Sequence, residues 1–232
     1  MKHALKWILS ILLLLGIAAG AYFWANAQID SNFNYRSVLK DNPPASGESL
    51  GEPSTQRMVF VLIDALRYDT SLKTDVMPNL NHLREIGASA LMHSQPPSFS
   101  EPGWSTLLIG AWPEINDGPV FNLGYDDIPA FTQDNLFTSA HRSGWKTAVS
   151  GYYWFEKMIP QSDVDFSFYT PDEDNAADIE VVNAALPWLT NKDAQFVLIH
   201  LDQVDYAGHH EGGPQSPNWD AAAVRADNML GQ

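Results

Sequence analysis

The residues that could carry chemistry are densest between His200 and Gly213, in the segment HLDQVDYAGHHEGG. This segment holds three histidines, two aspartates and a glutamate, and it follows the apolar run AQFVLI. Asp205 and His209 are four residues apart, so a helical turn would place a carboxylate and an imidazole on one face. Both groups are ligands for zinc or manganese, and Gly208 would let the backbone approach an ion. A solvated acidic loop is the alternative for such a cluster.

Two further residues could act with this segment. Asp64 directly follows the apolar run VFVLI, where a buried carboxylate needs a cation, Arg67 or a backbone cap as its partner. Considered alone, a pair with Arg67 is the favoured interpretation. Ser100 precedes Glu101 and Pro102, at or near the N-cap of a helix. It is either a capping residue or a nucleophile favoured by the helix N-terminus and by a metal ion.

The elements that must position these residues follow from hydrophobic periodicity. Apolar runs predict strands at 57–63, which reads as a central strand, and at 88–93, 145–151 and 195–201. Amphipathic patterns predict helices at 77–87, 102–110, 133–144 and 178–189, the last kinked or ended by Pro187. The alternation predicts an α/β domain with a mainly parallel sheet flanked by helices.

In such a sheet the ligands bind at the carboxyl ends of the strands. The loops that begin at Asp64, at His93 and at Asp202 are therefore expected at one edge.

Composition narrows the classes of function. The 232 residues include 45% hydrophobic residues, enough for a folded core. Acidic residues outnumber basic ones by 28 to 13, which argues against a nucleic-acid partner because phosphates need a positive face. The chain has no cysteine, so any metal must be bound by His, Asp and Glu.

The N-terminal segment 1–27 is predicted to be a membrane anchor or a signal segment. Its apolar run from Trp7 to Ala25 would span about 28 Å as a helix, close to the thickness of a bilayer. Lys2 and Lys6 precede this run and predict that the following domain lies outside the cytoplasm. Ala25-Asn26-Ala27 matches a cleavage pattern, so secretion after signal cleavage is the alternative. Residues 28–56 read as a polar linker, and 57–232 as the catalytic domain.

Four blocks in order then resemble the alkaline phosphatase superfamily. They are VFVLIDALRYDTS, MPNLNHLREIGA, PPSFSEPGWSTLLIGAWPEIND and HLDQVDYAGHHEGG, within a span from Met58 to Asn228. They are most similar to its type I phosphodiesterase/nucleotide pyrophosphatase branch and to the glycolipid-anchor ethanolamine-phosphate transferases. Trp104 stands where the sulfatase branch needs Arg, which argues against a sulfatase.

The resemblance implies roles for four residues. Asp64 and Ser100 would ligate one zinc ion, with Ser100 as the nucleophile, and Asp205 and His209 would ligate a second zinc. Manganese or magnesium could take the place of zinc. The enzyme would be a metal-dependent hydrolase of phosphoric esters, acting on a small molecule through a phospho-serine intermediate.

Two departures from the family pattern bear on this hypothesis. Gly103-Trp104 and Tyr206 replace residues that are usual near the substrate in the family. The family also supplies three downstream metal ligands, and this sequence contains no Asp-His pair to match them, so a domain truncated at its C-terminus is expected. His200 lies within a predicted strand and is therefore not expected to serve as a substitute ligand. The alternatives are a phosphoethanolamine-type transferase and a non-catalytic chain that binds metal or phosphate; the oligomeric state is left open.

Overall fold

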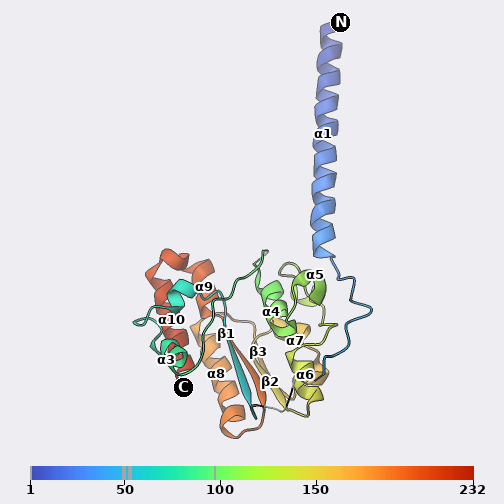
Figure 1. The fold of residues 1–232 in the computed structure, drawn as a ribbon. Helices are drawn as coiled ribbons and strands as arrows, with labels where there is room; N and C mark the ends of the chain where they lie inside the picture. The colour runs from blue at the N-terminus through green and yellow to red at the C-terminus, as the bar shows by residue number, and fades with distance from the viewer. Residues whose placement is uncertain (1, 49–50, 52–53, 97) are drawn as a thin grey trace.

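The structure, a computed structural model, describes residues 2–48, 51, 54–96 and 98–232 (Figure 1). Its strands are β1 (Met58–Ile63), β2 (Thr147–Tyr152), β3 (Phe166–Thr170) and β4 (Phe196–Leu201). Its α-helices are α1 (Lys2–Phe33), α2 (Tyr68–Ser71), α3 (Pro78–Ile86), α4 (Ser100–Ile109), α5 (Pro113–Asn116), α6 (Leu136–Arg142), α7 (Trp154–Met158), α8 (Asn175–Thr190), α9 (Gln203–His210) and α10 (Pro217–Leu230). Short 3-10 helices are η1 (Tyr125–Asp127), η2 (Gln161–Asp163) and η3 (Gly213–Gln215).

The four strands form a parallel sheet in the order β1-β4-β2-β3. All six residues of β4 are buried, which explains the uninterrupted apolar run that marks this strand in the sequence. The predicted central position of β1 is wrong for the described residues. β1 lies at an edge, and Met58 and Val59 are each more than 40% exposed.

Helices cover both faces of the sheet, and the alternation along β4 decides which side chains meet them. Val197, Ile199 and Leu201 pack into one apolar cluster with residues of α8, α9 and α10. Phe196 and Leu198 point the other way, into a cluster with residues of α4, α6 and α7. Figure 1 shows α8 and α10 on one side of the sheet and α4, α6 and α7 on the other. The predicted α/β class, with a parallel sheet flanked by helices, is confirmed.

Two predicted elements need correction, and one strand was not predicted. Residues 88–93 form no strand, and the sheet takes its fourth strand from Phe166–Thr170 instead, which the sequence analysis missed. The predicted end of the helix at Pro187 is wrong, because α8 continues to Thr190. Proline removes only the hydrogen bond of its own nitrogen, and its carbonyl still accepts from Asn191 N at 2.9 Å to complete the last turn.

The N-terminal helix continues beyond residue 27, the predicted limit of the anchor, to Phe33. Among the described residues, His3–Phe33 is the one helix long and apolar enough to cross a membrane. The next residues pack onto the domain, because Arg36 Nε donates to Asp117 Oδ1 at 2.9 Å and Ser37 is buried. In the predicted linker, the residues up to Phe33 are therefore helical, and Arg36 and Ser37 contact the domain. Helix α1 extends away from the domain at the end where this contact lies (Figure 1).

Candidate active site

The carboxyl ends of β1 and β4 bring three side chains together. The two strands are neighbours with Ile63 opposite Leu201, and Asp64 N donates to Leu201 O at 2.9 Å. His200 Nε2 lies 3.7 Å from Asp64 Oδ2 and 3.9 Å from Asp202 Oδ1. Ligand atoms of Asp64, His200 and Asp202 lie within 4.8 Å of one another, so these three residues could hold a metal ion.

His200 lies within β4, as predicted, and its ring nevertheless reaches both Asp64 and Asp202. Its ring packs edge-on against Trp104 and Phe155, on the α4 side of the sheet. Strand alternation turns it away from Ile199, and Gly151 leaves room for it, since a Cβ there would lie 2.6 Å from His200 Cβ. Both ring nitrogens and Asp64 Oδ2 are buried without a hydrogen-bond partner. Orphaned polar atoms of this kind fit a bound cation.

Ser100 is the first residue of α4, and the helix is capped by Phe99 without a side-chain bond. The alternative that Ser100 is simply the capping residue is therefore wrong. Its hydroxyl lies beside the Asp64 carboxylate and helps to lower the pKa of that group. The predicted convergence of Asp64, Ser100 and Asp202 at one edge is observed, although no strand precedes the Ser100 loop.

Helix α9 supplies Asp205 and His209, with His209 Nε2 3.5 Å from Asp205 Oδ2. This is the geometry that their spacing predicts. The role given to Gly208 is wrong, because its open side faces Trp219, whose Cζ3 would lie 3.1 Å from an added Cβ. His210 instead packs against the ring of Tyr206.

The favoured pairing of Asp64 with Arg67 is also wrong. Arg67 Nε donates to Asp69 Oδ1 at 2.9 Å, two residues further along the chain.

All four predicted site residues line one cavity of about 120 Å³. Its lining comprises Asp64, Ser100, Trp104, Asn122, Tyr152, Trp154, Glu173, Asp202, Asp205 and His209. Asn122, Tyr152 and Glu173 are not predicted from the sequence, because they come from a loop, a strand end and the turn before α8, where no periodic pattern marks a site. Asn122 Oδ1 accepts from Glu101 N at 3.0 Å, which ties this loop to the start of α4.

The electrostatics of the cavity favour a cation. Its described lining contains four carboxylates and no lysine or arginine. Burial, together with the charges of Asp64 and Asp205, raises the pKa of Asp202 to about 8, although His200 opposes this shift. Burial and the charge of Asp64 raise the pKa of Asp205 to about 6. Such shifts mean that several carboxylates compete for a limited positive charge, which a metal ion would supply.

The pKa values of His200 and Asp64 also reflect opposing effects of burial and of neighbouring charges. Burial lowers the pKa of His200, but the carboxylates of Asp202 and Asp64 outweigh burial and leave it raised. Burial raises the pKa of Asp64, but His200, the Ala65 N–H and the Ser100 hydroxyl together outweigh burial and leave it lowered. The donors are oxygens and imidazole nitrogens, which suit zinc or manganese.

The parallel sheet is flanked by helices, with Asp64 and Asp202 after neighbouring strands and Ser100 at the start of α4. This arrangement is an alkaline-phosphatase-like fold. Two solved structures agree. Phosphonoacetate hydrolase from Sinorhizobium meliloti, in complex with phosphonoacetate, matches with a TM-score of 0.58 at 15% identity, over 75% of this chain and 52% of that chain. Murine ectonucleotide pyrophosphatase/phosphodiesterase 5 matches with a TM-score of 0.55 at 18% identity, over 76% and 51%.

The family is established by the sequence. Residues 58–232 match the model of the type I phosphodiesterase / nucleotide pyrophosphatase family, and the chain belongs to this family. A curated relative, GPI ethanolamine phosphate transferase 2 of Eremothecium gossypii, is 26% identical over 197 residues, which cover 78% of this chain and 24% of that protein. The chain thus spans about a quarter of this relative and about half of the solved structures.

Proposed function

We propose that this chain carries the nucleophile and part of the metal site of a phosphoric ester hydrolase of the phosphodiesterase type. The observation that carries the proposal is the shared cavity, in which the Ser100 hydroxyl lies beside Asp64 and faces Asp205 and His209. Asp64 and Ser100 would hold one zinc ion, and Asp205 and His209 would contribute to a second. His200 and Asp202, whose ligand atoms lie near Asp64, complete the set of candidate ligands.

The proposed reaction uses Ser100 Oγ to attack phosphorus. The new Oγ–P bond forms as the bond to the leaving oxygen breaks, the hydroxyl proton passes to solvent, and the leaving oxygen takes a proton from water. Water then cleaves the phospho-serine. A bound zinc would supply the positive charge that lowers the pKa of the hydroxyl and neutralises phosphoryl oxygens. Without a cation, the adjacent Asp64 carboxylate would oppose formation of the serine alkoxide.

The surrounding residues have separate tasks in this proposal. Asn122 uses its carbonyl oxygen on Glu101 N, so its amide NH₂ is the end left to donate to a phosphoryl oxygen. Tyr152, Trp104 and Trp154 form the aromatic wall that limits water around the reacting group.

Replacement of Ser100 by alanine tests the nucleophile. Ser100→Ala should lower turnover of bis(4-nitrophenyl) phosphate at least about a thousandfold, because the variant lacks the hydroxyl proposed to attack phosphorus. Ser98→Ala is the matched control, since Ser98 lies two residues away and lines a different cavity. Circular dichroism and metal analysis should show that both variants are folded and comparably loaded. Activity that survives in Ser100→Ala would contradict the assignment.

A transferase is the second candidate, favoured by the similarity to GPI ethanolamine phosphate transferase 2. The same phospho-serine would then pass its group to an alcohol instead of water. Product analysis with and without an added primary alcohol separates the two, since a transferase forms the new ester in preference to the free phosphate monoester. Metal binding without any turnover would instead support the non-catalytic alternative.

We further propose that α1 anchors the domain outside the cytoplasm, which the basic residues before the apolar run support. The mass of the purified protein tests this. An uncleaved anchor leaves the chain at 25.8 kDa, whereas cleavage after Ala27 removes the helix and releases the domain from the membrane.

A further inference from the structure

The helix that carries two of the candidate metal ligands, α9, is not capped by its own N-cap residue. An aspartate at an N-cap ordinarily has extended backbone angles and accepts hydrogen bonds from N–H groups of the first turn. Asp174, the N-cap of α8, does this and accepts from Ala176 N and Ala177 N. Asp202, the N-cap of α9, has a φ of −110° and a ψ of −14°, and its side chain makes no cap bond. Its carboxylate lines the site cavity.

Asp178 of α8 supplies the carboxylate that Asp202 withholds from α9. Asp178 Oδ1 accepts from Asp202 N at 2.8 Å, and Asp178 Oδ2 accepts from Gln203 N at 3.3 Å. A helix leaves its first N–H groups without partners inside the helix, and its dipole favours a negative charge there. The cap of α9 is therefore provided by a different helix. Asp178 is 1% exposed and is not among the described residues that line the site cavity.

Buried hydrogen bonds fix this carboxylate in place. Gln203 Nε2 donates to Asp178 Oδ2 at 2.8 Å, and Gln203 Oε1 accepts from Arg225 Nε at 2.8 Å. Arg225 belongs to α10, so these bonds join α8, the start of α9 and α10, which pack together on one face of the sheet (Figure 1). Gln203 is 1% exposed, and removal of either partner would leave buried polar groups unpaired.

The position of this cap bears on the metal site. Asp202 Oδ1 lies 3.9 Å from His200 Nε2, and the ligand atoms of Asp64, His200 and Asp202 lie within 4.8 Å of one another. A cap bond to its own helix would occupy the carboxylate of Asp202 with N–H groups of α9. Because Asp178 provides the negative charge at this helix end, the carboxylate of Asp202 is left for a cation.

We propose that Asp178 is a positioning residue of the metal site, which caps α9 in place of Asp202 and so keeps the carboxylate of Asp202 available to the metal. This role rests on the metal binding in the proposed function. It adds a residue that touches neither the metal nor the substrate and acts through a ligand.

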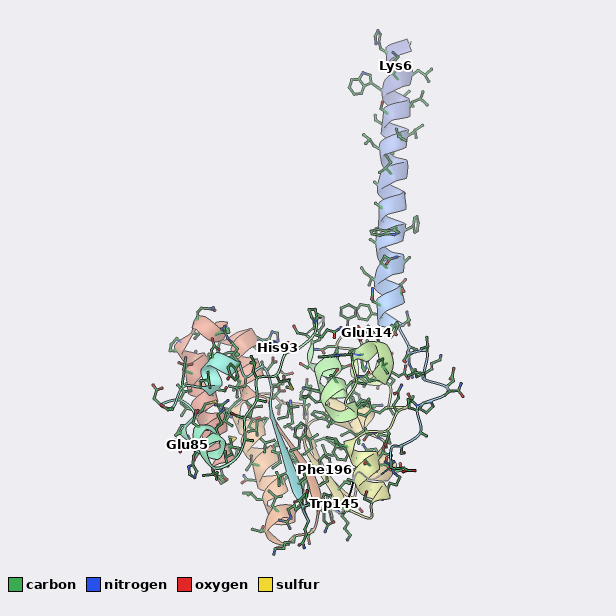
Figure 2. The ribbon with its side chains drawn as sticks, viewed as in Figure 1. Lys6, Glu85, His93, Glu114, Trp145 and Phe196 are labelled. Carbon is green, nitrogen blue, oxygen red and sulfur yellow. The ribbon has the colours of Figure 1, made fainter. Side chains whose placement is uncertain are left out.

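Asp227 provides a matched control. It is fully buried and accepts from Asn79 N at 2.9 Å, Leu80 N at 2.8 Å and Asn79 Nδ2 at 3.0 Å. Two backbone N–H groups and one side-chain amide are also the donors to Asp178. The helix that Asp227 caps is α3, which contributes none of the described residues of the cavity lining. Figure 2 shows Glu85, near the end of α3, at the outer side of the domain.

Asp178→Asn should weaken zinc binding at least about tenfold, because the start of α9 loses its carboxylate and Asp202 turns to cap its own helix. Asp227→Asn should lower the melting temperature by a similar amount and leave zinc affinity within about twofold of the wild type. Competition with a chromogenic zinc chelator measures affinity on the whole chain in detergent. Unchanged affinity in Asp178→Asn, or an equal loss in both variants, would overturn the proposal.

An exchange of the two side chains tests the same contact if Asp178→Asn alone does not fold. Asp178→Asn combined with Gln203→Glu swaps the amide and the carboxylate, and it keeps an acceptor for Asp202 N and for Arg225. Zinc affinity should return to within about threefold of the wild type, since the weaker bond from Gln203 N is the one lost. An exchanged variant that folds but binds zinc as weakly as a variant without Asp202 would refute the role of Asp178.

A double-mutant cycle shows whether Asp178 acts through Asp202. Asp202→Asn should weaken zinc binding, and Asp178→Asn should cause no further loss in that background, because the ligand that it positions is already gone. Losses that multiply would show that Asp178 acts on the fold in general and would overturn the proposal.

Turnover of bis(4-nitrophenyl) phosphate separates this role from the function on which it rests. A wild type that binds zinc but hydrolyses no ester contradicts the proposed function alone, and the zinc affinities still decide the role of Asp178. Hydrolysis by the wild type, with equal zinc affinity in Asp178→Asn, contradicts the role of Asp178 alone. A wild type that binds no zinc contradicts both.

Discussion

At the residue scale, two adjacent histidines on α9 differ in what they contact, and only one of them is proposed to bind metal. His209 and His210 are adjacent on α9, yet His209 lies 3.5 Å from Asp205 and lines the site cavity, whereas His210 packs against Tyr206. Both histidines are exposed. Their substitution should therefore leave the fold intact, so that a difference between them reports on metal binding alone.

His209→Ala should weaken zinc binding at least about tenfold, because it removes a nitrogen ligand from the Asp205 side of the cavity. His210→Ala should leave the affinity unchanged. Competition with a chromogenic zinc chelator measures both. An equal loss in the two variants, or no loss in either, would contradict the assignment of His209.

Glu101, next to Ser100, predicts a pH dependence of stability. Its side chain is fully buried, Oε1 accepts from Leu123 N at 3.0 Å, and Oε2 has no partner among the described residues. Burial raises the pKa of Glu101 from 4.5 to about 7, against the effect of the Leu123 bond. The folded protein therefore holds this proton more tightly than the unfolded chain, so stability falls as the pH rises from about 4.5 to about 7.

Glu101→Gln should remove this cost because glutamine has the same shape and no charge. The variant should be more stable than the wild type by about 1–3 kcal/mol at pH 8, with the difference shrinking towards pH 5. Thermal unfolding followed by near-UV circular dichroism, with chelator present, measures this at each pH. A constant difference across that range would show that the carboxyl does not titrate between those values.

At the scale of elements, the site depends on the packing of β2 against β4. Gly151 lies near the end of β2 and faces His200, and a Cβ at that position would come within 2.6 Å of His200 Cβ. Contacts below 3.0 Å require one strand to move. The absence of a side chain at Gly151 is therefore what lets the histidine lie beside Asp64.

Gly151→Ala should destabilise the fold by about 1–3 kcal/mol and weaken zinc binding, because the strain falls on a strand that carries a candidate ligand. Gly103→Ala is the control, since that glycine faces open space within a helix and alanine there should be neutral or mildly stabilising. Urea unfolding and zinc titration of both variants provide the comparison. A Gly151→Ala protein with unchanged stability and affinity would contradict this account.

The sequence predicts the buried elements better than the peripheral ones. β4 is buried along its length and gives a continuous apolar signal, whereas β3 lies at the edge with Ser167 exposed among Phe166, Phe168 and Tyr169. Residues 88–93 are as apolar as a strand, but a strand also needs a neighbouring strand to pair with through backbone hydrogen bonds. In this chain the second strand in sequence is Thr147–Tyr152.

The candidate site shows the same division. Asp64 and Asp202 follow apolar runs, so the rule that ligands bind at strand ends was enough to place them together. His200 required the register and the alternation of β4, and Asn122 required a loop fold fixed by its bond to Glu101 N. Neither contact is encoded in local spacing. Residues brought in from loops could not be predicted without the tertiary structure.

At the scale of the whole molecule, the segment after α1 fixes how the domain stands relative to the anchor. Asp117 is fully buried at its side chain and accepts from Arg36 Nε at 2.9 Å, Ser37 N at 2.8 Å and Thr132 Oγ1 at 2.9 Å. Burial raises the pKa of Asp117, but Arg36, Ser37 N and Thr132 together outweigh burial and leave it lowered. The contact therefore contributes stability above the ordinary pKa of 3.8 and loses it as the pH falls through the lowered value.

Asp117→Ala should release this attachment, because it removes the partner of Arg36 and of Ser37 N together. Trypsin cleaves after arginine, so cleavage after Arg36 at pH 8 should accelerate at least about fivefold, as expected for a segment that opens more often. Asp220→Ala is the control, since it breaks the exposed pair with Lys73 elsewhere on the domain. If both variants were cut after Arg36 at the wild-type rate, contacts other than those of Asp117 would hold the segment after α1 on the domain.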